Sequence, residues 1–252
     1  MNQETRRRRI IERVERRGEG SIGALAEEFE VSEMTIRRDL DALGAEGRVI
    51  RTHGGATASG RVSFEFSFLR RTRENGAEKQ QIADQALELV SDGQSVLLDS
   101  GTTTLAVARE LTKRRDLTVV TTSLPVASEL QYCPTIQVLL LGGYLRSGSP
   151  DLSGGLTERN LEALRTDIAF LGADAVDRQG FVDNNSVDLA TLLAKMAASA
   201  AAVYVVADHT KLGRSGLMQY GVLSRFAALI TDSGAPAAST SELEANGVTV
   251  LR

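Results

Sequence analysis

Most of the chain alternates between short apolar stretches and longer stretches with helical periodicity, from Asn75 to the C-terminus. Buried parallel strands are nearly continuous apolar runs, and each needs a crossover, usually a helix, before the next strand. We therefore expect an α/β domain with a doubly wound, mostly parallel sheet. The predicted strands are Ser95 to Leu98, Leu117 to Thr121, Ile136 to Leu141, Ile168 to Leu171, Ala202 to Ala207, Ala227 to Thr231 and Val248 to Leu251. The predicted helices are Glu78 to Val90, Thr104 to Leu111, Pro125 to Leu130 and Val187 to Ala200.

The N-terminal part has a different pattern, with short amphipathic segments in place of apolar strands. Arg6 to Arg17 has apolar residues at helical spacing, and a second helix is expected from a Ser21 cap to Phe29. Ser32 is a favourable N-cap for a third helix that reaches Ala45. Two helices joined by a tight turn are typical of a helix-turn-helix, and Arg48 to Gly55 predicts a wing after it.

The third helix has one apolar face and one face rich in hydrogen-bond donors. Its apolar residues fall in one narrow sector, namely Ile36, Leu40 and Leu43. Thr35, Arg37 and Arg38 point away from that sector, near the helix N-terminus, where a recognition helix contacts bases and phosphates. The alternative is that the two arginines only solvate the helix or pair with Asp39 and Asp41.

Composition favours a globular protein without a membrane span. The 252 residues are 42% hydrophobic, and the longest uncharged apolar run, Met196 to Ala207, is much shorter than the roughly 20 residues that cross a bilayer. With one cysteine, Cys133, and no apolar stretch after the first residues, we expect no internal disulfide, no signal peptide, no membrane partner and a cytoplasmic location. The net charge of −4 does not exclude nucleic acid, because the arginines cluster in the N-terminal part.

A set of N-terminal residues reproduces a known signature in order and spacing: Arg6, Ile10, Val14, Ser32, Thr35, Ile36, Arg37, Arg38, Asp39 and Leu40. The stretches GRVIRTHGGA, VVTTS, LLLGGYL, FLGADAVDRQGF and VVADHTKLG follow along the chain. Over nearly its full length the sequence resembles the DeoR family of bacterial transcription regulators. The resemblance implies a DNA-binding regulator, usually a repressor of sugar-utilisation genes, whose C-terminal domain is isomerase-like and senses a phosphorylated sugar.

This interpretation divides the chain into a winged helix-turn-helix (1–57), a connector (58–74) and an effector-binding and oligomerisation domain (75–252). The expected partners are double-stranded operator DNA, a phosphorylated sugar and further copies of the chain, in a dimer or tetramer. The residues predicted to contact DNA are Arg6, Arg7, Ser32, Thr35, Arg37, Arg38, Arg51 and His53.

The effector site is predicted where polar loops follow apolar strands. The loop from Asp99 to Thr104 opens a helix, so its backbone N–H groups and hydroxyls form a potential anion site. Loops after neighbouring parallel strands share one sheet edge and should converge with it. By resemblance, Asp208 would accept a ligand hydroxyl and Lys211 would pair with phosphate. The predicted effector residues are Asp99, Ser100, Gly101, Thr102, Thr103, Thr104, Thr122, Gly142, Gly143, Asp174, Asp183, Asp208 and Lys211.

Departures from the family pattern leave the identity of the sugar open. Thr122 stands where asparagine is common, and the helix that carries Leu189, Leu193 and Ala194 is usually more charged. The family's effector domain resembles ribose 5-phosphate isomerase, whose chemistry needs a carboxylate base. Ala194 stands where that base would lie, and Leu171 replaces an aspartate, so we expect a sensor and not an enzyme.

Two other kinds of site are not supported by the sequence. His53 and His209 are the only histidines and fall in different predicted domains, so we expect neither a metal site nor a catalytic triad, and no cofactor. A further alternative to a regulator and an enzyme is a protein that only binds other macromolecules and has no small ligand. This hypothesis leaves the threonine-rich loop and Lys211 unexplained.

Overall fold

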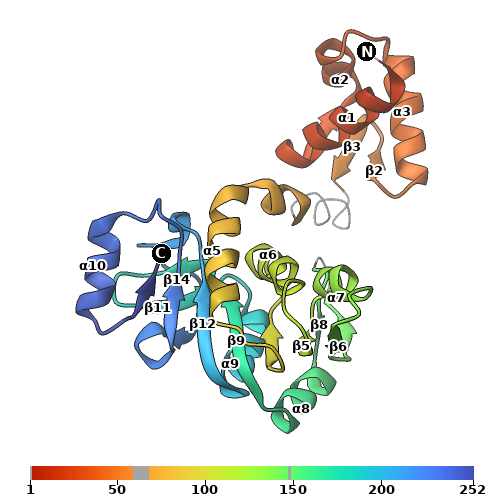
Figure 1. Cartoon of the computed structure of the whole chain (residues 1–252). Coiled ribbons are helices and arrows are strands. Elements are labelled where there is room, and N and C mark those ends of the chain that lie inside the picture. Colours follow the sequence, from red (N-terminus) through yellow and green to blue (C-terminus); the bar gives the residue numbers. More distant parts are fainter. Residues whose placement is uncertain (1, 59–67, 147–148) are drawn as a thin grey trace. The chain divides into compact units, whose positions relative to one another are not determined.

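The computed structural model describes residues 2–58, 68–146 and 149–252, and the chain divides into two compact units, Met1–Arg71 and Thr72–Arg252 (Figure 1). Residues 2–58 of the first unit form three helices and an antiparallel sheet of strand order β1-β3-β2. Its elements are α1 (Gln3–Arg17), β1 (Glu19–Ser21), α2 (Ile22–Glu28), α3 (Glu33–Ala45), β2 (Val49–Thr52) and β3 (Gly55–Ala58). The predicted winged helix-turn-helix is confirmed.

Capping side chains determine where these helices begin. Ser21 and Ser32 accept hydrogen bonds from the amides of Ala24 and Thr35 at 3.3 and 3.2 Å, so the predicted starts of α2 and α3 are confirmed. α1 begins earlier than predicted because the side chain of Asn2 caps it. The fully buried side chains of this unit come from all three helices, and they include Ile10, Val14, Leu25, Ile36 and Leu40.

Two details of the first unit differ from the prediction. The short strand β1 pairs with β3, although its three residues are too few to show apolar alternation. β3 ends at Ala58, which had been assigned to the connector. Of that connector, residues 59–67 lie outside the described residues.

The second unit is built on a seven-stranded sheet with strand order β15-β14-β12-β9-β4-β5-β6, in which all neighbours pair in parallel. The strands are β4 (Ser95–Leu98), β5 (Leu117–Thr121), β6 (Ile136–Leu140), β9 (Thr166–Gly172), β12 (Ala200–Val206), β14 (Ala228–Ile230) and β15 (Val250–Leu251). The predicted parallel α/β sheet is confirmed, and β4 and β5 have the predicted bounds.

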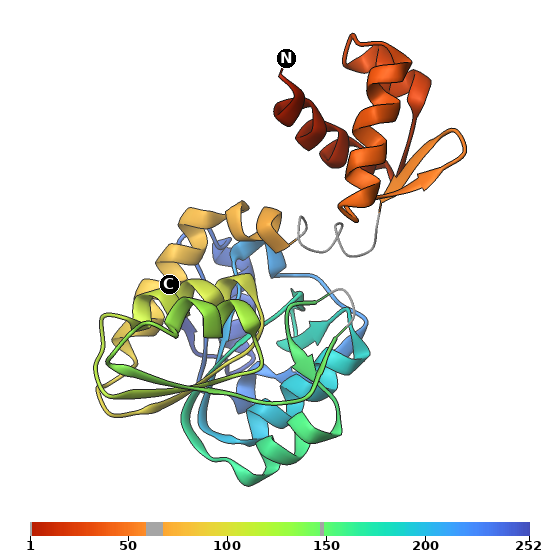
Figure 2. The same cartoon turned by 90° about the vertical axis from the view of Figure 1, so that its right-hand side faces the viewer.

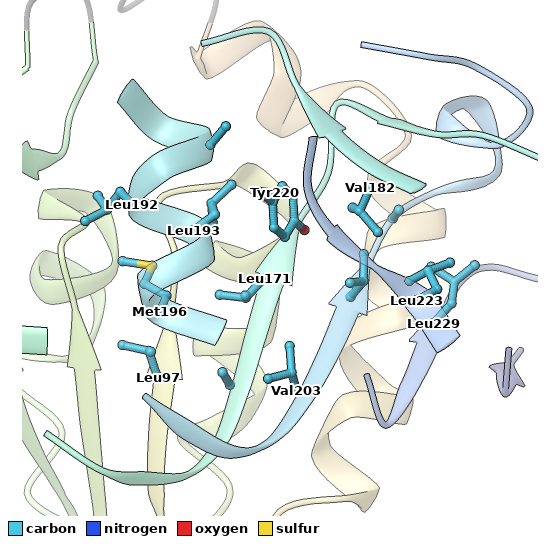
Figure 3. Close-up of a cluster of buried hydrophobic side chains, with 14 of the residues drawn as sticks. Leu97, Leu171, Val182, Leu192, Leu193, Met196, Val203, Tyr220, Leu223 and Leu229 are labelled. Atoms are coloured by element: carbon cyan, nitrogen blue, oxygen red, sulfur yellow. The ribbon is translucent and has the colours of Figure 1, made fainter. Parts of the chain in front are cut away.

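Helices cover both faces of this sheet. They are α5 (Gly76–Glu88), α6 (Thr102–Leu111), α7 (Leu124–Leu130), α8 (Gly155–Ala163), α9 (Val187–Ala198) and α10 (Ala237–Ala245). Figure 2 shows α8 and α9, in green and cyan, on the opposite side of the sheet from α5, α6 and α7. Between the sheet and α9, Leu97, Leu171 and Val203 pack with Leu193 and Met196 (Figure 3). None of the helices within the described ranges is long and apolar enough to cross a membrane.

The strand order reverses between β4 and β9. From β4 the chain adds β5 and β6 on one side, and it then returns to the other side of β4 to form β9. The carboxyl ends of β4 and β9 therefore border the crevice where open parallel sheets bind ligands.

Several short elements near this edge were not predicted. A hairpin pairs β7 (Tyr144–Leu145) with β8 (Leu152–Ser153), and a small antiparallel sheet joins β10 (Ala175–Val176), β11 (Phe181–Asn184) and β13 (Met218–Val222). These strands have two to five residues each and lack the apolar runs that identified the main sheet.

Candidate functional site

The exposed face of α3 presents two arginines. Arg37 forms an i,i+4 pair with Glu33 at 3.3 Å, and the two side chains are 48% and 59% exposed, so the pair is open to solvent. Arg38 is also exposed, and no ion pair is found for it among the described residues. The alternative pairing of these arginines with Asp39 and Asp41 is wrong, because both aspartates bind other arginines.

Asp39 is a buried residue of α3, and its carboxylate binds two arginines of α1. Its side chain is 1% exposed, and its Oδ2 and Oδ1 atoms lie 2.6 and 3.0 Å from Nε of Arg6 and Nε of Arg7. Burial acts to raise the pKa of Asp39, but the hydrogen bonds and charges of Arg6 and Arg7 outweigh it and lower the pKa. The Nε atoms of Arg6 and Arg7 are thus engaged inside the unit, and the role of these two arginines as phosphate contacts stays a prediction.

The other predicted DNA residues divide into structural and exposed groups. Ser32 and Thr35 share a 2.9 Å hydrogen bond between their hydroxyls in the cap of α3. Arg51 binds Asp41 at 2.9 Å and also donates to the carbonyl of Gly55, so it braces the wing against α3. His53 is exposed at the turn between β2 and β3. Arg37, Arg38 and His53 thus remain the predicted residues with the most accessible polar groups.

In the second unit, Asp99 joins the ends of β4 and β9. Its carboxylate is 3% exposed and accepts hydrogen bonds from Thr104 Oγ1 at 2.5 Å, from the amide of Gly101 at 2.9 Å and from the amide of Gly172 at 2.8 Å. Burial raises the pKa of Asp99, these three bonds oppose the shift, and the nearby charge of Asp151 adds to it. Both its oxygens hold the loop in place, and a direct contact of Asp99 with a ligand stays a prediction.

The loop held by Asp99 delivers the N-terminus of α6 to this edge. Gly101 is the N-cap and has no side chain to cap the helix. The first hydrogen bond of the helix runs from the amide of Leu105 to the carbonyl of Gly101. The amides of Thr102, Thr103 and Thr104 have no acceptor among the described residues. Three amides at the positive end of a ten-residue helix are donors of the kind that the predicted anion site needs, and ligand binding there stays a prediction.

The loops after β5 and β6 lie against the hairpin. The carbonyl of Thr122 accepts from the amide of Leu152 at 2.9 Å, while its buried Oγ1 has no partner in the described part of the chain. Thr157 Oγ1 donates to the carbonyl of Gly142 at 2.6 Å. A Cβ on Gly143 would lie only 2.6 Å from the carbonyl oxygen of Ser153 and would also overlap the Thr157 hydroxyl, so Gly143 allows a close approach of backbones.

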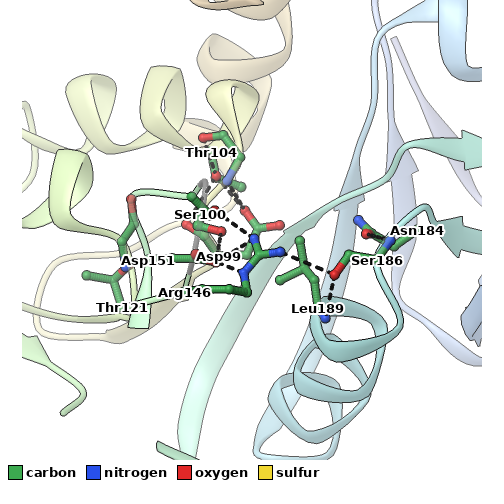
Figure 4. Close-up of polar contacts among 12 residues, drawn as sticks. Asp99, Ser100, Thr104, Thr121, Arg146, Asp151, Asn184, Ser186 and Leu189 are labelled. Carbon is green, nitrogen blue, oxygen red and sulfur yellow. Dashed lines mark hydrogen bonds and ion pairs between the residues drawn. The ribbon is translucent and has the colours of Figure 1, made fainter. Parts of the chain in front are cut away.

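Arg146, which the sequence did not single out, forms the main polar cluster of this edge (Figure 4). Its Nε and Nη2 atoms each donate to Asp151 at 3.0 Å, Nη2 also donates to Ser149 at 2.7 Å, and Nη1 donates to Ser186 at 3.2 Å. Asp151 is fully buried and also accepts from Ser100 Oγ at 2.8 Å. The cluster links the loop after β4, the hairpin and the N-cap of α9.

The remaining predicted effector residues are mostly engaged in local bonds. Asp174 and Asp183 accept from the amides of Asn185 and Gly216 at 3.0 and 2.8 Å. Asp208 is 2% exposed, and its Oδ1 atom accepts from Asn75 Nδ2 at 3.2 Å and from the amide of Thr210 at 3.0 Å, so its role as a hydroxyl acceptor for the ligand stays a prediction.

Lys211 follows β12 and is partly exposed. No hydrogen bond or ion pair within the described ranges joins it to the loop after β4. Its role as the phosphate partner therefore stays a prediction. The same ranges contain no cluster of three or more His, Cys, Asp or Glu that would hold a metal ion.

Comparison with known families agrees with this geometry. Residues 6–61 match the DeoR-like helix-turn-helix domain, and residues 74–233 match the DeoR C terminal sensor domain. The chain belongs to the DeoR family. The resemblance found in the sequence is thereby confirmed, and this DeoR-family protein is a DNA-binding transcription regulator with a sensor domain.

Curated DeoR-family relatives align along nearly the whole chain. The HTH-type transcriptional regulator GlpR of Haloferax volcanii is 37% identical over 246 residues, covering 98% of this chain and 96% of that protein. The glycerol-3-phosphate regulon repressor of Escherichia coli K12 is 32% identical over 237 residues, covering 94% and 93%. The lactose phosphotransferase system repressor of Lactococcus lactis is 33% identical over 237 residues, covering 92% of each.

Among solved structures, ribose 5-phosphate isomerase A of Methanocaldococcus jannaschii matches 54% of each chain with 23% identity and a TM-score of 0.42. A likeness of this size carries no conclusion about catalysis. The curated relatives described above are named as transcription regulators or repressors.

Proposed function

We propose that this regulator represses genes of carbohydrate use by binding operator DNA, and that a phosphorylated sugar bound to the second unit controls it. The uncapped N-terminus of α6 carries the effector half of the proposal. It offers three free amides at the crevice between β4 and β9, and a phosphate monoester accepts such bonds with its oxygens. The names of two relatives, a glycerol-3-phosphate regulon repressor and a lactose phosphotransferase system repressor, support this chemistry.

The DNA half rests on the first unit. α3 would enter the major groove with Arg37 and Arg38 toward bases and phosphates, and His53 of the wing would lie near the backbone. A single module of this size has a small footprint, so we expect a dimer or tetramer on repeated half-sites. Ligand binding would alter the placement of the paired DNA-binding units, with a coupling of about 1 to 3 kcal/mol per site.

A thermal-shift screen tests the effector half. Glycerol 3-phosphate, ribose 5-phosphate and glucose 6-phosphate are each compared with the unphosphorylated compound. A ligand at about 100 times its Kd should add roughly 2.7 kcal/mol to the free energy of unfolding and raise the melting temperature. We expect one phosphate ester to stabilise the protein where its parent alcohol does not. If phosphorylated and free compounds behave alike across a wider panel, the phosphate site at α6 is wrong.

A further inference from the structure

Arg146 has one more hydrogen-bond donor than its neighbours use. A guanidinium carries five N–H groups. Asp151 takes two of them, Ser149 a third and Ser186 a fourth. The second N–H of Nη1 has no acceptor among the described residues, and the side chain is 20% exposed.

The four occupied donors hold the guanidinium in one orientation. Asp151 accepts from Nε and Nη2 of the guanidinium, and the Ser100 hydroxyl also donates to Oδ2 of Asp151, which helps to hold that carboxylate in place. Ser186 in turn is fixed as the N-cap of α9, where it accepts the amide of Leu189 at 3.3 Å. In Figure 4 the guanidinium lies between the loop of Asp99 to Thr104 and the N-terminus of α9. Its free N–H is thus a preorganised donor beside the anion site of α6.

The charges of this edge create a need for such a donor. Asp99 and Asp151 are both buried, and Asp99 directly precedes the loop that opens α6; burial raises the pKa of Asp99, and the charge of Asp151 adds to that rise. A phosphate ester that approaches the α6 amides meets this negative potential. Arg146 is the cation bonded directly to this cluster, through Asp151.

We propose that Arg146 binds the anionic group of the effector through its free N–H, and that Asp151 and Ser186 act as positioning residues for it. This inference rests on the proposed function, because it assigns a contact within the same effector site.

Removing Arg146 alone would leave Asp151 buried without a counter-charge and could unfold the unit. The test therefore uses Arg146→Gln/Asp151→Asn, which replaces both charges with amides that can still bond to each other, and Arg146→Lys, which keeps the ion pair but loses the planar fork. Arg178→Ala is the control, because that side chain is 77% exposed and its ion pair is with Glu242 of α10.

Calorimetry on the full-length protein measures the Kd of inorganic phosphate and of the three esters named above, at several salt concentrations. We expect the double variant to raise the Kd by about tenfold or more, Arg146→Lys to raise it by a smaller factor, and Arg178→Ala to change it less than about twofold. The dependence of Kd on salt should also weaken in the double variant, since one charged contact is gone.

Two negative outcomes are distinguishable. If the folded double variant binds the ester with the Kd and salt dependence of the wild type, Arg146 is only a structural brace and the inference is overturned. If the wild type itself binds neither phosphate nor any ester, the proposed effector site fails, and the role of Arg146 fails with it.

Discussion

At the residue scale, one carboxylate of α1 is held in an environment that favours its neutral form. Burial raises the pKa of Glu15 from 4.5 to about 7, the charge of Arg48 opposes the shift, and that of Glu12 adds to it. The Oε1 atom of Glu15 is buried and has no hydrogen-bond partner among the described residues. Near neutral pH this side chain therefore exchanges a proton within the DNA-binding unit.

The direction of the pH effect follows from linkage. The folded state binds the Glu15 proton more tightly than the unfolded chain does, so the contribution to stability is complete below pH 4.5 and is lost as the pH rises through about 7. In Glu15→Gln this loss should be absent. Because Glu15 is only half-buried, we expect the variant to be more stable than the wild type above about pH 7 by no more than about 1 kcal/mol.

Hydrogen exchange of α1 amides between about pH 5 and pH 8, corrected for intrinsic rates, measures this difference. Glu27→Gln on the exposed side of α2 is the control and should follow the wild type. Equal pH dependence in Glu15→Gln and the wild type would show that Glu15 does not titrate in this range.

At the element scale, the orientation of α3 depends on a clamp between helices far apart in sequence. Arg6 and Arg7 of α1 close on Asp39 of α3 across more than thirty positions. The paired arginines were visible in the sequence, but their partner was not, since nothing local indicates that Asp39 faces inward. The N-caps Ser21 and Ser32, by contrast, were predicted correctly because capping acts within one turn.

The same distinction applies to the effector site. The loop at Asp99 was predicted because it directly follows an apolar strand and opens a helix. Arg146 and Asp151 were missed because they lie in a polar segment without periodicity, and their importance comes from contacts with Ser100 and Ser186, 51 and 40 residues away. Local patterns reveal strands and caps, whereas hydrogen bonds between segments far apart in the sequence need the tertiary structure.

The clamp can be tested with Asp39→Asn. This change leaves Arg6 and Arg7 without their counter-charge, and we expect it to destabilise the first unit by about 2 kcal/mol, less than a fully buried pair because Arg7 is partly exposed. The pKa of Asp39 is lowered in the folded state, so the ion pairs of Asp39 stabilise the first unit above pH 3.8. This stabilisation is lost as the pH falls further, and Asp39→Asn should not show that loss.

Asp41→Asn on the same helix is the matched control, because its side chain is 65% exposed and its pair with Arg51 should contribute only about 0.5 kcal/mol. Hydrogen exchange of α3 amides compares the two variants. A similar loss of protection from exchange in both variants would mean that burial does not make the Asp39 ion pairs stronger than the Asp41 ion pair.

At the scale of the whole molecule, two compact units divide DNA recognition from effector recognition. Arg38→Ala should weaken operator binding and reduce the slope of log K against log salt concentration by about one. The rise in melting temperature caused by the effector should stay unchanged. Lys211→Ala should do the reverse. Operator titration at several salt concentrations and the thermal-shift screen measure both properties in each variant. A variant that loses both at once would contradict this division.

Every strand and loop of the proposed effector site, from Asp99 to Lys211, belongs to the second compact unit, and the proposed recognition helix and the wing belong entirely to the first. The two units therefore occupy separate stretches of the sequence as well as separate compact parts of the structure. A single recombination event within the connector would transfer a complete sensor from one family member to the operator specificity of another. A crossover inside the sheet would separate Ser100 from Asp151, or Arg146 from Ser186, and would leave neither parent's site intact.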